Sequence, residues 1–118
     1  MQEEPIELVA ASIEKLSAGD LEINMEIKRH DEVGMIAERV NFMAAKFKEI
    51  ISDISMFLND ISAGDLNASS KCEYPGEFRG IRLSMEKIVE RLNNIMSIIN
   101  SSAEHVNSSA EQISGAAQ

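Results

Sequence analysis

The chain has 118 residues, about the length of one domain, and 44% of them are apolar, so it can bury a core. It carries 11 basic and 20 acidic residues, a net charge of −9. This balance excludes the cationic surface that binds a nucleic acid duplex or holds an amphipathic helix on an anionic membrane. No run approaches the ~18 apolar residues of a bilayer span, so we expect neither nucleic acid binding nor direct membrane insertion. The single cysteine, Cys72, cannot form an internal disulfide and fits a reducing compartment.

The first predicted helix covers residues 5–18. Its apolar residues follow the 3, 4, 3 spacing of a coiled-coil heptad seam, at Ile6, Val9, Ile13 and Leu16. Such an aliphatic seam suits a chain in which only 4% of the residues are aromatic. The run from Ser17 to Asp20 ends the helix, because Gly19 can adopt the left-handed conformation of a helix C-cap.

The connector over 19–31 is longer than the roughly 2–5 residues of an antiparallel helical hairpin. Extended at ~3.3 Å per residue, it can return along a helix of ~21 Å and start a second, parallel helix. Apolar and polar residues alternate along it, which would also suit an isolated β-strand, with apolar Leu21, Ile23, Met25 and Ile27. We predict an extended segment that lays alternate side chains on a helical bundle. Asp31 is the expected N-cap of the second helix, residues 32–50.

The whole pattern recurs 45 residues later. The hexapeptide that begins at Leu16 recurs from Ile61, and apolar positions of both helices map onto apolar positions of the second copy. The second copy therefore predicts a helix over 51–63, a connector over 64–76, capped at its start by Gly64, and a helix over 77–96. In this connector, smaller residues replace most of the apolar series, namely Ala68, Ser70 and Cys72. We therefore expect it to be held less tightly than the first connector.

The two copies are predicted to share one helix. Residues 35–62 contain neither Gly nor Pro, so the helix should run through the junction. The seam steps from Phe47 to Ile51, four residues where three were due, which is a stutter that locally unwinds a supercoil. A second apolar stripe overlaps it at Ile50, Ile54, Phe57 and Ile61. Two stripes suit either a helix that rotates or a helix that is simply buried more broadly.

The heptad pattern continues past the second copy. Its positions run from Phe78 to Ala116, and from Ser102 every second one is Ser or Ala. Because small residues bury little area, we predict a softer coiled coil over 97–118. The pattern begins near the first residue and stops in mid-heptad at Gln118. We therefore expect the chain to be a fragment of a longer, rod-like protein.

Narrow seams on two parallel helices cannot be buried within one chain, and isolated helices of this length are marginal in water. Two chains side by side would enclose every seam in a four-helix bundle. The predicted fold is all-α: a homodimer that forms two stacked parallel four-helix bundles, joined by a continuous helix and extended by a C-terminal coiled coil. Tetramers stay open as an alternative.

This layout resembles the HAMP domain, the signal-relay module of bacterial transmembrane receptors. The first copy, residues 1–50, carries Pro5 and then the motifs Gly19-Asp20-Leu21, Asp31-Glu32-Val33-Gly34 and Asn41-Phe42-Met43. The second, residues 51–96, looks like a divergent unit of a tandem array. In it, Ile50 replaces the proline, and the run from Gly76 to Gly80 replaces the Asp-Glu-Val-Gly turn. The tail from Ser101 is similar to the start of the signalling helix of a methyl-accepting chemotaxis protein.

The resemblance implies a chemoreceptor relay that passes a conformational change through dimeric bundles to a downstream helix, by a shift between packings of similar energy. It places Pro5 at the input junction, Leu21 as a connector anchor with Met25 or Ile27 as the second, and Glu32 and Gly34 at the start of the second helix. Further residues assigned to packing and relay are Ile36, Phe47, Ile50, Ile51, Leu66, Phe78 and Ile81. The parent is expected in the inner membrane, with this part cytoplasmic and coupled to a kinase and an adaptor.

Two alternatives stay open. The same modules could precede a histidine kinase or a cyclase, and the residues beyond Gln118 would separate these from a chemoreceptor. The chain could also be a purely structural dimerisation rod. Against that rod, the resemblance predicts that changes at Pro5, Gly34 or the stutter alter downstream output.

The sequence carries no recognisable catalytic chemistry. It shows no nucleophile–base pair, phosphate-binding loop or metal-ligand cluster, so we expect no enzyme activity, cofactor or metal in this chain. His30 and His105 lack metal-ligand neighbours and are expected at the surface. His105 is followed by Val106 rather than by the Glu of a kinase phosphoacceptor. The pair Glu111-Gln112 loosely resembles a methylation site, or is an ordinary exposed helix pair.

Overall fold

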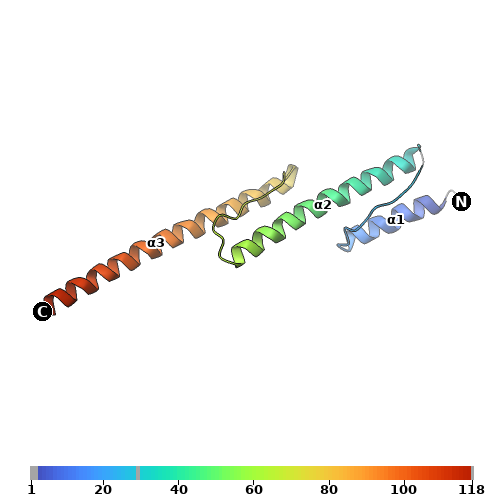
Figure 1. Ribbon diagram of the computed structural model, residues 1–118. Coiled ribbons are helices and arrows are strands. Elements are labelled where there is room, and N and C mark those ends of the chain that lie inside the picture. The colour runs from blue at the N-terminus through green and yellow to red at the C-terminus, as the bar shows by residue number, and fades with distance from the viewer. Residues whose placement is uncertain (1–2, 29, 118) are drawn as a thin grey trace. The chain divides into compact units, whose positions relative to one another are not determined.

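The structure is a computed structural model that describes residues 3–28 and 30–117. These residues form three α-helices, α1 (Glu3–Ser17), α2 (Glu32–Ser62) and α3 (Arg79–Ala117), with a 3-10 turn, η1 (Gly76–Phe78), before α3 (Figure 1). The described residues contain no strand, so the predicted all-α class is confirmed. The homodimeric stacked bundles stay a prediction.

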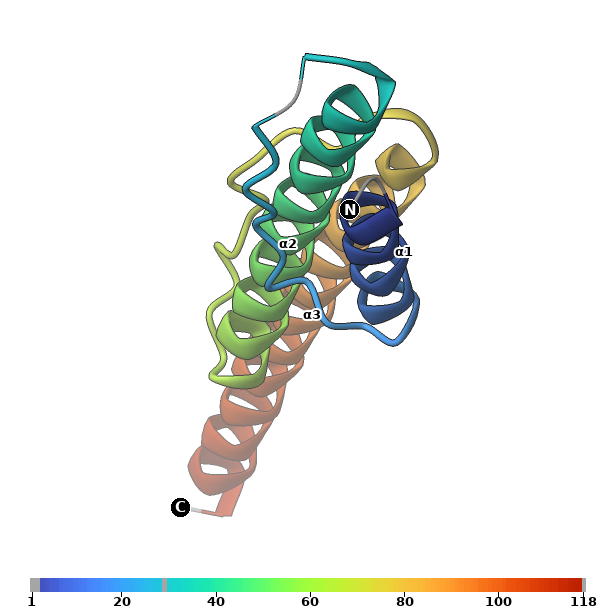
Figure 2. The same ribbon diagram turned by 90° about the vertical axis from the view of Figure 1, so that its right-hand side faces the viewer.

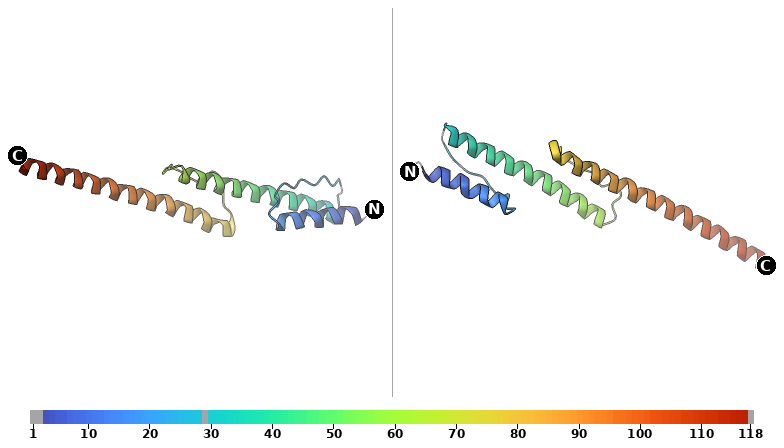
Figure 3. Two further views of the ribbon diagram at one scale, coloured as in Figure 1. Left: turned by 90° about the horizontal axis from the view of Figure 1, so that it is seen from below. Right: turned by 180° about the vertical axis from the view of Figure 1, so that it is seen from behind.

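The chain divides into two compact units, Met1–Ser55 and Met56–Gln118. The predicted boundary between the repeats lies slightly earlier, after Ile50. In the first unit the connector returns beside the helices, so that α1 and the start of α2 run in the same direction (Figures 1 and 3). In the second unit the connector likewise runs back, and α3 runs parallel to the end of α2. The long connectors therefore produce parallel helices.

Both connectors begin with the same turn. Gly19 and Gly64 have φ angles of 92° and 90°, the left-handed conformation that the repeated hexapeptide predicts. The Asp20 N–H donates to the Lys15 carbonyl at 2.9 Å, and the Gly19 N–H donates to the Leu16 carbonyl at 3.0 Å. This is a Schellman motif, which satisfies the last carbonyls of α1. The equivalent bonds of the second unit, from Asp65 to Asp60 and from Gly64 to Ile61, have the same lengths of 2.9 and 3.0 Å.

The two second helices begin differently. At the start of α2, the Asp31 carboxylate accepts a hydrogen bond from the Gly34 N–H at 3.2 Å, so the predicted N-cap is confirmed. At the equivalent point of the second repeat, Gly76 has a φ of 56° and Pro75 provides no side-chain cap. The chain there enters α3 through η1 instead. The predicted helix start at residue 77 thus falls inside a 3-10 turn, because Gly76 cannot accept the bonds that Asp31 accepts.

The helix predicted to cross the junction is continuous, because α2 runs unbroken from Glu32 to Ser62. Past the second repeat, α3 runs without a break to Ala117, as the continuing heptads predict. Within the described residues, the second unit's predicted helix and the C-terminal extension are therefore one element.

Each unit has its own small core. In the first unit, Val9 of α1, Met25 of the connector, and Ala37 and Val40 of α2 form a buried cluster, with other apolar side chains packed on it: Leu16, Ile23, Ile27 and Val33. Three of the four alternating apolar connector residues, Ile23, Met25 and Ile27, thus pack in or on this core. In the second unit the buried apolar residues are Phe57, Ala68, Tyr74 and Met85. Tyr74 extends the alternation of the second connector by two residues.

Candidate signal-relay surface

The heptad seam of the first repeat is split between covered and exposed side chains. Val9 and Val40 are buried and Leu16 and Val33 are half-buried. The alternate seam residues are 39% to 56% exposed, namely Ile6, Ile13, Ile36 and Met43. On each helix the exposed pair is seven residues apart, so both members lie on one face.

The second repeat shows the same division at the equivalent positions. Met85 is buried, and Ile54, Ile61 and Phe78 are half-buried. Their alternates are 38% to 52% exposed, namely Ile51, Leu58, Ile81 and Ile88. We call these four residues, together with Ile6, Ile13, Ile36 and Met43, the exposed seam. The 45-residue repeat is therefore a repeat of exposure as well as of sequence.

The first connector is held at its middle by Asn41 of α2. The Asn41 side chain accepts a hydrogen bond from the Met25 N–H at 2.9 Å and donates one to the Met25 carbonyl at 2.8 Å. These two bonds satisfy both polar groups of a backbone segment that packs on the core. Lys48 and Glu22 form an ion pair further along, which is exposed and therefore contributes little. Figure 2 shows this connector passing along α2.

The second connector is held at a different point. The Asn93 side chain of α3 donates to the Leu66 carbonyl at 3.1 Å and to the Val89 carbonyl of its own helix at 2.9 Å. At the positions equivalent to Met25 and Asn41, the second repeat has Ser70 and Glu86. The side chains that fix the middle of the first connector are thus replaced in the second.

The predicted site residues occupy three kinds of environment. Gly34 and Ile50 are buried, and Glu32, Ile36, Ile51 and Ile81 are exposed. The half-buried set comprises Pro5, Leu21, Ile27, Phe47, Leu66 and Phe78. Of the two candidates for second connector anchor, Met25 lies in the core cluster and Ile27 packs against it.

Sequence reasoning missed the polar connector contacts. Asn41 belongs to the Asn41-Phe42-Met43 motif, but the sequence does not predict its two hydrogen bonds to Met25. A helix pattern does not show which group an amide side chain will bond. Asn93 carries no motif at all. Tyr74 is 5% exposed and was missed because it follows a weakly apolar connector.

The two predicted apolar stripes of α2 differ in exposure. Ile50 and Phe57 are each 1% exposed, whereas Ile51 and Leu58 are each 52% exposed. Neighbouring positions on one helix thus carry both a buried and an exposed apolar series. Both predicted apolar stripes are therefore present on α2, as a rotating helix and a more broadly buried helix would each require.

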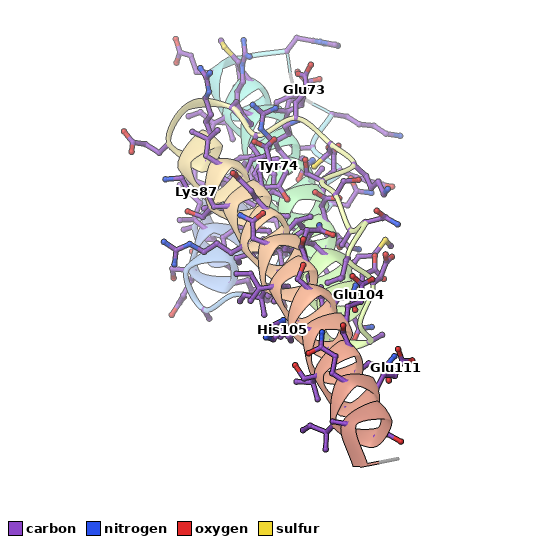
Figure 4. The ribbon with its side chains drawn as sticks, turned by 90° about the vertical axis from the view of Figure 1, so that its left-hand side faces the viewer. Glu73, Tyr74, Lys87, Glu104, His105 and Glu111 are labelled. Atoms are coloured by element: carbon purple, nitrogen blue, oxygen red, sulfur yellow. The ribbon has the colours of Figure 1, made fainter. Side chains whose placement is uncertain are left out.

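The polar candidates of the C-terminal helix lie at its surface. Figure 4 shows Glu104, His105 and Glu111 along α3, and Glu111 and Gln112 are both exposed. His30 is exposed as well. Among the described residues, no cluster of His, Cys, Asp or Glu could hold a metal ion. None of the helices in the described part of the chain combines the length and apolarity needed to cross a bilayer.

Comparison with known families gives one match. The model of the HAMP domain matches residues 4–49. This range contains α1, the first connector with its Asn41 clamp, and the part of α2 that packs on them. No solved structure matches the chain. A HAMP domain is thus found at residues 4–49, and this match supports a HAMP-containing signalling protein.

Proposed function

We propose that the chain is the relay section of a bacterial chemoreceptor, built from two successive HAMP-like units in a parallel homodimer. The first is the HAMP domain of residues 4–49. The second is the divergent repeat over 51–96, and α3 carries the signal into a downstream coiled coil. In this proposal the chain catalyses no reaction and needs no cofactor.

The observation that supports the proposal is the exposed seam. Burying an Ile, Leu or Met side chain stabilises a structure by about 1.5–3 kcal/mol. Eight such residues face outward in matched positions of the two repeats. A second copy of the chain, related by an axis parallel to the helices, would bring each exposed face against its own equivalent. Each repeat would then complete a four-helix bundle.

The relay mechanism follows from the overlap of the two stripes on α2. A small rotation of a helix exchanges which of two neighbouring stripes faces the bundle axis, and interlocked packing favours discrete arrangements over continuous ones. Ile50 and Ile51 sit where that exchange would occur, beside the stutter. We propose that an input at Pro5 shifts α1, that the clamped connector passes the shift to α2, and that α2 delivers it to the second unit.

Disulfide cross-linking tests the homodimer. In a Cys72→Ser background, Ile36→Cys and Ile81→Cys should each link two chains readily under mild oxidation. Glu38→Cys and Leu83→Cys are matched controls, because they lie two residues further along the same helices and are also exposed. We expect them to link poorly. Equal linking at all four positions would contradict the parallel bundle.

The parent and its output are the finer part of the proposal. HAMP domains sit on the cytoplasmic side of membrane receptors, and we propose that this parent is anchored in the inner membrane and couples through an adaptor to a kinase. The resemblance of the tail to a chemotaxis signalling helix favours this over a histidine kinase or a cyclase. The exposed Glu111 and Gln112 are candidate methylation sites in the same proposal.

A functional assay separates the relay from a structural rod. The intact parent receptor is expressed in cells that lack other receptors, and kinase output is recorded with and without stimulus. Gly34→Leu and a one-residue deletion at the stutter should change output while the dimer persists. Glu38→Ala, on the outward face of α2, is the control. If stability changes but output never does, the chain is a rod and the relay proposal fails.

A further inference from the structure

The second unit contains a cavity of about 160 Å³ beneath its connector. Phe57 of α2, Ala68 of the connector, and Met85 and Val89 of α3 provide its apolar wall. Three of these four side chains are at least nine-tenths buried, at 1% exposure for Phe57, 6% for Ala68 and 4% for Met85. The cavity thus has a firm apolar floor inside a single unit.

The repeat explains why this space is empty of side chains. In the first unit, the connector places Ile23 and Met25 against the helices, and Met25 is part of the buried core. At the equivalent positions the second connector has Ala68 and Ser70, both of which line the cavity. The second connector thus has much smaller side chains at these two positions. The second unit therefore carries a space of about one large side chain.

The polar wall of the cavity contains a cation and an anion, Arg82 and Glu86. Arg82 Nε is excluded from solvent and has no hydrogen-bond partner. The nearest carboxylate oxygen recorded for it, Glu86 Oε1, lies at 3.8 Å, which is an ion-pair distance but too long for a hydrogen bond. Among the lining residues, all in the described part of the chain, Arg82 is the one cation and Glu86 the one anion. Their charges offset each other, so the cavity disfavours a charged guest.

We propose that this cavity is a binding site for a compact, uncharged and largely apolar molecule. A cavity of about 150 Å³ is large enough for a six-membered ring. The ring would contact Phe57 and Met85. Such a guest occupies the place that Met25 fills in the first unit, so it would hold the second connector against its helices. The site does not depend on the relay, although its occupancy would stabilise one packing of the second unit.

Nuclear magnetic resonance on the intact chain tests the site, with cyclohexanone as the probe. The methionine methyl groups are labelled with carbon-13, which places a reporter on Met85 in the cavity and on Met25 and Met35 in the first unit. Cyclohexanone should shift the Met85 signal saturably and leave the other two unchanged. Methylcyclohexane, which has a similar size and no polar atom, should produce the same saturable shift, since the apolar wall provides the contacts.

Filling the cavity provides the matched variants. Ser70→Met and Ala68→Ile restore the residue type of the first repeat, and either should abolish the Met85 shift while the circular dichroism spectrum stays helical. Ser101→Met, on the exposed part of α3, should leave binding intact. The proposal is overturned by any of three results: no saturable shift at Met85, equal shifts at all methionines, or unchanged binding in both filled variants. The first of these would mean that water alone occupies the space.

Discussion

The two connectors share a first turn and differ in almost everything after it. Both leave their helix through a Schellman motif whose bonds have equal lengths. In each, an aspartate side chain then accepts the N–H two residues on, from Glu22 in the first and Asn67 in the second. Beyond that point the first connector is clamped at Met25 and its core is filled. The second is held near its start by Asn93 and covers a cavity.

This difference shows which positions of the repeat tolerate a change of residue. A seam residue contacts two or more helices, so its size and polarity are constrained from several sides. A connector residue packs on one side only, and a change there leaves a cavity without breaking the helices. We infer that the second unit opens locally more readily than the first, because a cavity lies beneath the middle of its connector, where Met25 packs in the first unit.

Truncation of the middle connector residue should have the largest effect on stability, and this effect should differ most between the two units. Met25→Ala removes a buried side chain from the first core and should lower the free energy of unfolding by about 2–5 kcal/mol. Ser70→Ala at the equivalent position should change it by about 0.5 kcal/mol or less, because the cavity already exists. Urea unfolding at a fixed chain concentration measures both. Similar losses in the two variants would show that the connectors are packed alike.

Removal of the amide clamps should have the next largest effect. Asn41→Ala leaves the Met25 N–H and carbonyl without their partner and should cost about 1–3 kcal/mol. Asn93→Ala removes a bond in an exposed setting and should cost less than about 1 kcal/mol. Hydrogen exchange gives a local readout, since the Met25 amide should lose its protection in the first variant. Retained protection there would argue against the clamp.

Alanine at the two turn glycines should show the smallest difference between the two units. No atom lies within 4 Å of a Cβ added at Gly19 or Gly64, so the penalty is that of the left-handed backbone alone. We expect about 1–2 kcal/mol in both Gly19→Ala and Gly64→Ala. Thermal unfolding of the two variants side by side checks this. A marked difference between them would mean that the turns are not equivalent in solution.

Much of the fold could be predicted from local patterns. Heptad spacing indicated the helices, the glycine after each first helix indicated its end, and Asp31 indicated the start of α2. The absence of Gly and Pro over 35–62 indicated one continuous helix. Each of these depends on a few neighbouring residues, which is why the sequence alone was sufficient. The 3-10 entry to α3 was not predicted, because it depends on how Pro75 and Gly76 bend the chain.

The candidate surface was predictable only in part. The seam was visible in the sequence, but its division into covered and exposed residues required the connector to be in place. The same holds for the Asn41 clamp, since sixteen residues separate Asn41 from the Met25 backbone that it bonds.

The sequence by itself determined the helices, their turns and the 45-residue repeat, because spacing and capping act over a few residues. The tertiary structure was needed to show which seam residues are exposed, which residues hold each connector and where the second unit contains a cavity. These properties depend on the volume and polar groups that distant segments present to one another. A Met and a Ser occupy the same position of the two repeats, and only the packing shows the space that the smaller side chain leaves.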